Sequence, residues 1–168
     1  PSAFESWLPH IAALGRPRVV SLPGYEGEPP VWPPSLDAKV QAVLRATDGM
    51  EDAVVLGFSA GFYVATHAVL AGMPASRLLG IGPSRGPSVD ERPAFRQFAD
   101  ELERGANLEA VMRARMVAPG APDALRDAAA SWLDAVPTDV LAAELRAYVD
   151  WPDLAPALER VRVPVRLL

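Results

Sequence analysis

The central segment of this chain is Ala53-Val-Val-Leu-Gly-Phe-Ser-Ala-Gly-Phe-Tyr-Val-Ala-Thr-His-Ala-Val-Leu70. Its first four residues, Ala53 to Leu56, are apolar without polar alternation, which is typical of a strand buried on both faces of a parallel sheet. The pentapeptide Gly57-Phe-Ser-Ala-Gly61 follows at once, and a run rich in alanine and valine follows that. A strand, G-x-S-x-G and a helix in this order predict a sharp turn that exposes Ser59 as a candidate nucleophile.

The same motif predicts roles for the neighbours of Ser59. Gly57 and Gly61 should let the strand and the helix pack closely around a strained serine. The backbone N–H of Ala60 would face the oxyanion that develops on a reacting carbonyl group, and Phe58 is a candidate substrate contact. G-x-S-x-G also occurs by chance in ordinary turns between a strand and a helix, and here the flanks on both sides favour the catalytic interpretation.

Bulk composition excludes several classes of protein. The chain has 168 residues, of which 50% are hydrophobic, and a net charge of -5. This length suits one domain with a sizeable core. No basic run or stripe of arginine, lysine and aromatic residues predicts binding to nucleic acid. The chain has no cysteine and two histidines without ligand spacing, so we expect no disulfide, no metal site and no cofactor.

The sequence also carries no targeting pattern. We find no signal peptide and no apolar run of membrane-spanning length, so a cytoplasmic location and no membrane partner are expected. The partner expected from the family resemblance described below is a small-molecule substrate. The first residue is Pro1 rather than methionine, and we therefore expect the sequence to start inside a longer protein. No pattern predicts the oligomeric state.

The N-terminal segment predicts one helix and one strand. Residues 3–14 have apolar side chains at helical spacing, and Pro9 should bend this helix or move its start. His10 is expected to be an ordinary surface or boundary histidine. Residues 18–22 predict a short strand, and the glycine-containing turn that follows lacks the lysine and the spacing of a phosphate-binding loop.

Further elements alternate along the chain. Ser35 is the predicted N-cap of a helix that begins at Leu36 and stops at Asp48. Two more strands are predicted at residues 77–81 and 161–168. Strands that alternate with helices indicate a parallel α/β sheet with right-handed crossovers.

A long helical insertion separates the last two predicted strands. From Glu91 to about Leu158 the sequence shows four apolar helical faces, broken at Gly105 and at several prolines. An insertion of this size is more often a lid than a separate domain, and most of its large apolar side chains should form the core of that lid. The predicted division is core over 1–85, lid over 86–150 and a return to the core over 151–168. Candidate substrate contacts in the lid are Phe95, Met112 and Trp132.

These pieces together resemble the α/β-hydrolase superfamily, in its lid-bearing branch of small esterases, proline iminopeptidase-like enzymes and carbon–carbon bond hydrolases. The matching pieces cover nearly the whole chain: Trp7, Val19 to Gly27, Gly57 to Gly61, the helical lid, and Asp153 to Val165. The resemblance implies a doubly wound parallel sheet with a helical lid. It also implies a serine hydrolase that cleaves an ester or amide bond of a small, partly apolar substrate by acyl transfer through Ser59. Two positions depart from the family pattern, since Ser21 replaces a usual acidic residue and Phe62 replaces a frequent second glycine.

The resemblance further implies that catalytic groups lie outside these residues. The triad order in this fold is Ser, acid, His, so we expect the acid beyond Leu168, the histidine later still, and the second oxyanion donor before Pro1. The fold is thus expected to be incomplete at both ends, and the segment alone to be inactive. His67 lies eight residues beyond Ser59, about 12 Å along the helix axis, which is too far for a general base. A lyase or perhydrolase on the same scaffold and a non-catalytic binding protein remain as alternatives.

Overall fold

Three parallel strands carry the central part of the chain. The computed structural model describes residues 7–13, 15–107, 120–124, 127 and 136–168. Its elements in chain order are α1 (Leu8–Ala12), α2 (Leu36–Ala46), β1 (Ala53–Phe58), α3 (Ala60–Leu70), β2 (Ala75–Ile81), α4 (Arg92–Glu103), α7 (Thr138–Val149), α8 (Ala155–Leu158) and β3 (Val165–Leu167). The strands pair in the order β1-β2-β3, and both pairs are parallel. The predicted α/β class with a parallel sheet is therefore confirmed.

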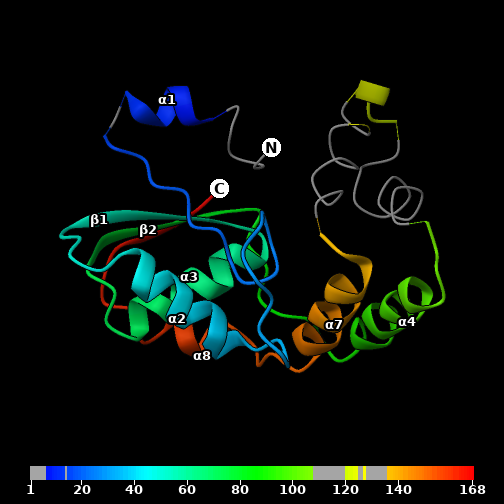
Figure 1. Cartoon of the computed structure of the whole chain (residues 1–168). Helices are drawn as coiled ribbons and strands as arrows, with labels where there is room; N and C mark the ends of the chain where they lie inside the picture. Colours follow the sequence, from blue (N-terminus) through cyan, green and yellow to red (C-terminus); the bar gives the residue numbers. More distant parts are fainter. Residues whose placement is uncertain (1–6, 14, 108–119, 125–126, 128–135) are drawn as a thin grey trace.

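Three helices pack on one face of this sheet. In Figure 1, α2, α3 and α8 lie below the strands, whereas α1 stands on the opposite side. The central helix is α3, which contacts β1, β2, α2 and α8. The largest fully buried side chains of this core are Phe62, Tyr63, Leu78 and Leu154. Each side chain of this size contributes about 1.5–3 kcal/mol when its apolar surface is removed from water.

Strand β1 is well buried on one face only. Val55 and Gly57 are buried, whereas Val54 is 62% exposed. The prediction that Ala53 to Leu56 is buried on both faces is therefore wrong for Val54. Side chains alternate between the two faces of a strand, and the helices α2, α3 and α8 cover only one of those faces (Figure 1).

Helices α4 and α7 form a second packing unit. They lie side by side at one end of the molecule (Figure 1). Their shared core consists of Phe98, Ala99, Leu102, Val136, Val140, Leu141 and Ala142. The apolar faces predicted for the first and the last helix of the insertion are confirmed by this cluster. The two faces predicted between them fall mostly outside the described residues.

A buried junction joins this helix pair to the rest of the molecule. Lys39 Nζ on α2 donates a hydrogen bond of 2.7 Å to Glu144 Oε1 on α7, and the two side chains are 5% and 9% exposed. Lys39 Nζ also lies 5.2 Å from the centre of the Tyr25 ring. Burial and, secondly, the Glu144 carboxylate raise the pKa of the Tyr25 phenol, which keeps it neutral. A Cβ atom at Gly24 would lie 2.8 Å from Val140 Cγ1, so this turn fits against α7 only with glycine there.

Residues 18–22 do not form the predicted strand. Among the described residues their backbone takes part in no strand ladder, and a β-strand exists only through hydrogen bonds to a neighbouring strand. The apolar side chains still have a role, because Val20 and Leu22 pack against the main core. The predicted strand is therefore wrong, although two of its apolar side chains are partly buried against the core.

Other predicted boundaries shift for local reasons. The last strand covers Val165–Leu167 rather than residues 161–168, because Pro164 has no N–H to donate to the ladder. Helix α1 begins at Leu8 with Pro9 in its first turn, where the missing N–H of proline does no harm. Ser35 caps α2 as predicted, since its Oγ accepts a hydrogen bond of 3.1 Å from the N–H of Ala38.

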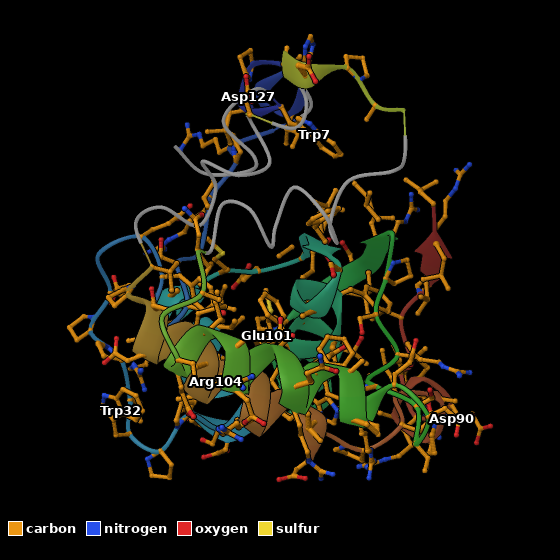
Figure 2. All side chains as sticks on the ribbon, turned by 90° about the vertical axis from the view of Figure 1, so that its right-hand side faces the viewer. Trp7, Trp32, Asp90, Glu101, Arg104 and Asp127 are labelled. Carbon is orange, nitrogen blue, oxygen red and sulfur yellow. The ribbon has the colours of Figure 1, made fainter. Side chains whose placement is uncertain are left out.

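The proline-rich connector between residues 29 and 34 lies at the surface. Trp32 is 56% exposed, and Figure 2 shows it at the edge of the molecule. No helix in the described part of the chain is long and apolar enough to cross a membrane.

Candidate active site

Ser59 occupies a strained corner between β1 and α3. Its backbone angles are φ 50° and ψ −124°, a region that residues other than glycine rarely adopt and that costs about 1–3 kcal/mol. The corner is held by its own backbone hydrogen bonds. Ser59 N–H donates to Ile81 O at 3.0 Å, and Ser59 O accepts from Phe62 N–H at 3.1 Å and from Ser84 N–H at 3.2 Å. The surrounding backbone therefore fixes the position of the Ser59 Cα atom, to which the side chain is attached.

Only one of the two motif glycines is required for close packing. A Cβ atom at Gly57 would lie 2.3 Å from the Cα atom of Phe62 and 2.6 Å from its nitrogen, so β1 and α3 can meet only because this side chain is missing. A Cβ atom at Gly61 would meet nothing within 4 Å. The expectation that both glycines allow the crowding is therefore correct for Gly57 and wrong for Gly61.

Phe62 is accommodated by a glycine on the neighbouring strand. The Phe62 side chain is fully buried, and a Cβ atom at Gly80 would lie 2.8 Å from its Cδ2 atom. The large side chain at position 62 thus uses the space left by a missing side chain on β2. This contact explains how the helix after Ser59 packs against the sheet without a glycine at position 62.

The polar groups of the corner are available for a reaction. Ser59 is half-buried, and neither its Oγ atom nor the N–H of Ala60 bonds to a described residue. The N–H of Ala60 belongs to the first turn of α3, where helix geometry leaves amide groups without an internal partner. Phe58 is 40% exposed beside them. An oxyanion formed next to Ser59 could therefore accept a hydrogen bond from Ala60.

Neither histidine of the chain is placed as the base of Ser59. The His67 ring stacks on Tyr63 with the ring centres 4.9 Å apart, and its Nε2 atom is buried without a hydrogen-bond partner among the described residues. Burial, and secondly the charge of Arg160, lower the pKa of His67. His10 is exposed on α1. The described residues also contain no cluster of histidine, cysteine or carboxylate side chains that could hold a metal ion.

The carboxyl ends of the three strands meet at the edge where Ser59 lies. Leu168 N–H donates to Gly80 O at 2.8 Å, and Gly82 N–H donates to Leu168 O at 3.1 Å. Ser59 follows β1 at this edge, and Ser84 follows β2. Ligands of open parallel sheets bind at this edge.

A cavity of about 340 Å³ lies between this edge and the α4–α7 pair. It is lined by Pro83, Ser84, Arg85, Gly86, Pro87, Glu91, Phe95 and Tyr148. The candidate contact Phe95 is thus a lining residue, with its ring 5.3 Å from that of Tyr148. The candidates Met112 and Trp132 lie outside the described residues.

Sequence reasoning missed the polar part of this lining. Ser84 and Arg85 carry no motif, and their one signal in the sequence is their place directly after a strand of the sheet. Tyr148 lies on the last of the four predicted apolar faces, with Leu141 and Leu145, yet its hydroxyl group is hydrogen-bonded to Ser84 Oγ. Burial raises the pKa of Tyr148, so this phenol is protonated at neutral pH.

Solved structures of other proteins share this fold. A hydrolase from Pseudomonas aeruginosa PA01 matches with a TM-score of 0.80 and 20% identity, over 98% of this chain and 64% of that chain. The chain has the α/β-hydrolase fold. The esterase EaEST from Exiguobacterium antarcticum matches with a TM-score of 0.77 and 18% identity, over 98% of this chain and 66% of that one. MenH from S. aureus matches with a TM-score of 0.71 and 20% identity, over 88% and 62%.

The α/β-hydrolase fold is established here by structure alone. No protein-family model and no curated protein matches the sequence, and the chain spans less than two thirds of each of the three solved structures. The G-x-S-x-G sequence of this chain lies between a strand and a helix, with Ser59 directly between β1 and α3.

Proposed function

We propose that the full-length protein is a serine hydrolase and that Ser59 is its nucleophile. The observation that carries this proposal is the backbone of Ser59, which has φ 50° and ψ −124° at the end of β1. Glycine would adopt such a conformation with far less strain, so packing alone gives no reason for a serine there. A strained residue with a free hydroxyl group beside a free amide is typical of a functional site.

The chemistry would be acyl transfer. Ser59 Oγ attacks the carbonyl carbon of an ester or amide while its proton passes to a general base, and the N–H of Ala60 donates to the resulting oxyanion. Collapse of this intermediate expels the alcohol or amine and leaves an acyl-serine ester, which water then hydrolyses.

We further propose that the base is a histidine held by a carboxylate, both outside residues 1–168. Neither His10 nor His67 is placed at Ser59, and the order in this fold is Ser, acid, His. The carboxyl end of β3 reaches the same edge as Ser59 through the hydrogen bonds of Leu168. A residue carried by the chain after β3 would therefore enter the edge where the nucleophile lies.

The α4–α7 pair belongs to the proposed lid over residues 86–150. The support is its place beside the cavity, where Phe95 from α4 and Tyr148 from α7 face loop residues that follow β2. The lining of this cavity does not include Ser59, and its volume of about 340 Å³ lies at the small end of the range for ligand sites. We therefore propose a small, partly apolar ester or amide as the substrate.

An activity-based probe tests the nucleophile. The full-length protein should be labelled by a fluorophosphonate, and Ser59→Ala should abolish labelling. Ser76→Ala is the matched control, because Ser76 lies in β2 and its Oγ donates to Asp52 O, away from the corner. Labelling of Ser59→Ala at the rate of the unchanged protein would refute the assignment. A folded protein that is never labelled would instead support the alternative, a non-catalytic binding protein.

A further inference from the structure

The cavity between the sheet edge and the α4–α7 pair has a rigid wall. Arg85 O accepts a hydrogen bond of 2.9 Å from Leu154 N–H. Gly86 has φ 90°, and a Cβ atom there would lie 2.9 Å from Pro152 O. Tyr63 OH donates to the same Pro152 O at 2.6 Å. The loop after β2 is therefore held against the segment that follows α7, and its polar groups are preorganised.

A pair of hydroxyl groups in this wall always leaves one hydrogen free. Ser84 Oγ accepts a hydrogen bond of 3.1 Å from Gly86 N–H and shares another with Tyr148 OH. The two hydroxyl groups carry two hydrogens, and their mutual bond uses one of them, whichever group donates. The other hydrogen is available to an occupant of the cavity. Ser84 N–H also donates a hydrogen bond to Ser59 O, so the backbones of Ser84 and Ser59 lie side by side.

The cavity also contains one positively charged side chain that no hydrogen bond or ion pair satisfies in the described part of the chain. Arg85 and Glu91 are its charged lining residues. Glu91 Oε2 accepts the N–H of Ser88 at 2.8 Å, and this bond is the main reason that the pKa of Glu91 is lowered. The Arg85 guanidinium makes no hydrogen bond or ion pair with any residue that the structure describes. The charge of Arg85 is the last of the causes that lower the pKa of Glu91, so Arg85 acts on Glu91 through charge, and its guanidinium N–H groups remain available to a ligand.

We infer that this cavity binds a carboxylate of the substrate, with Arg85 and the Ser84–Tyr148 hydroxyl pair as donors. The inference rests on the proposed function and narrows its substrate to acidic esters or amides. A carboxylate offers two oxygen atoms, which match the fork of a guanidinium together with one hydroxyl hydrogen. The apolar chain between the carboxylate and the reacting carbonyl group would pass Phe95 and Pro83.

A matched pair of esters tests the charge preference. Mono-4-nitrophenyl adipate and 4-nitrophenyl hexanoate differ only in a terminal carboxylate that replaces a methyl group. The quantity measured is the kcat/KM for the adipate ester divided by the kcat/KM for the hexanoate ester, in the full-length protein. Arg85→Ala should lower this ratio about tenfold, as expected for the loss of one charge-assisted contact. The change should come from a higher KM for the adipate ester. Arg96→Ala, on α4 outside the cavity, should leave the ratio unchanged. An equal ratio in Arg85→Ala and the parent protein would overturn the inference.

Glu91, the negatively charged lining residue, should have the opposite effect on the kcat/KM ratio of the two esters. Glu91→Gln removes a negative charge beside the proposed carboxylate and should raise the same ratio, and added salt should reduce both effects by screening. A ratio that falls in Glu91→Gln would contradict a carboxylate in this cavity.

Removal of the hydroxyl groups gives a second, non-additive signature. Ser84→Ala leaves the Tyr148 hydrogen free, and Tyr148→Phe leaves the Ser84 hydrogen free. Each single variant should therefore change the ratio little, whereas the double variant should lower it several-fold. Additive effects of the two substitutions would show that the pair does not act as one donor.

A binding measurement separates this inference from the proposed function. Titration of the Ser59→Ala variant with monomethyl adipate requires no catalysis. The affinity should fall about tenfold in Ser59→Ala/Arg85→Ala. If Arg85→Ala weakens the binding of monomethyl adipate but the parent protein hydrolyses no ester, the carboxylate site is supported and the proposed hydrolase activity is refuted. If the parent protein hydrolyses both 4-nitrophenyl esters but Arg85→Ala does not weaken the binding of monomethyl adipate, the hydrolase is supported and the carboxylate site is refuted.

Discussion

Lys39 and Glu144 are 105 residues apart in sequence and form an ion pair of 2.7 Å between α2 and α7. This pair is buried, and it lies where the α4–α7 unit meets the sheet unit. Removal of one partner leaves an uncompensated charge in the interior, whereas removal of both leaves an apolar contact. The pair therefore makes the docking of α7 depend on two residues at once.

Lys39→Met should lower the free energy of unfolding of the full-length protein by about 3–5 kcal/mol, because Glu144 is left buried without its partner. Lys39→Met combined with Glu144→Leu should recover most of this loss. Urea denaturation followed by tryptophan fluorescence measures both effects.

An exposed pair on the same helix is the control. Arg146 on α7 bonds to Asp100 at 2.6 Å and to Glu103 at 2.7 Å, with side chains that are 43–53% exposed. Arg146→Ala should cost less than about 1 kcal/mol, because water screens the interaction. Equal losses for Lys39→Met and Arg146→Ala would show that burial of the first pair has no energetic consequence.

Gly57→Ala should prevent folding or lower the free energy of unfolding by more than about 3 kcal/mol, because the new methyl group meets backbone atoms that cannot rotate away. Gly61→Ala should leave the stability unchanged or raise it by up to about 1 kcal/mol, since alanine is the better helix former. Thermal unfolding of the two variants checks this contrast. Similar melting temperatures for the two would contradict the geometry of the corner.

Ser59→Gly should make the full-length protein more stable while it removes the proposed nucleophile. Relief of the strained backbone should stabilise the folded state by about 1–3 kcal/mol. Glycine also raises the conformational entropy of the unfolded chain, which costs about 0.5–1 kcal/mol of stability, so the gain is larger than the cost. Ser59→Ala keeps the strain and should leave stability near that of the parent. Chemical denaturation of the two variants is the measurement, and a glycine variant less stable than the alanine variant would refute the strain.

The stability of the protein should fall below about pH 6.5 because of His67. Burial lowers the pKa of His67 below its ordinary value of 6.5, so the unfolded chain takes up the proton first as the pH drops. The free energy of unfolding therefore decreases from about pH 6.5 down to the lowered pKa of the folded state.

His67→Phe is the variant that checks this titration. Phenylalanine keeps a ring against Tyr63, which lies 4.9 Å from the His67 ring, and it carries no proton that titrates. Its free energy of unfolding should depend less on pH between 7.5 and 5.5 than that of the parent protein. Parallel pH profiles for the two proteins would assign the acid sensitivity to other groups.

Structural features that are determined by a few consecutive residues could be predicted from the sequence. The corner at Ser59, the cap at Ser35 and the glycine after α4 each depend on the conformation of one short segment. The buried faces of the insertion follow from helical spacing, as the burial of Phe98 and Leu102 shows. In all of these cases local chemistry and tertiary packing favour the same structure.

Features that depend on a distant partner could not be predicted. Residues 18–22 have the composition of a strand, but a ladder needs a second segment that composition does not identify. Ser84 and Tyr148 are 64 residues apart, and each is unremarkable in its own segment. The cavity and its donors thus arise only when the loop after β2 and α7 are brought together.

The contact between Phe62 and Gly80 constrains how this protein can vary among its relatives. Without the Phe62 ring, a Cβ atom at position 80 would keep one close neighbour, Leu167 Cδ2 at 3.0 Å, whereas with phenylalanine at 62 it would also meet the ring at 2.8 Å. Phenylalanine and glycine at these two positions should therefore be inherited together. The combination of phenylalanine at position 62 and glycine at position 80 would distinguish close homologues of this chain from other esterases of the same fold, even where overall sequence identity is too low to distinguish them.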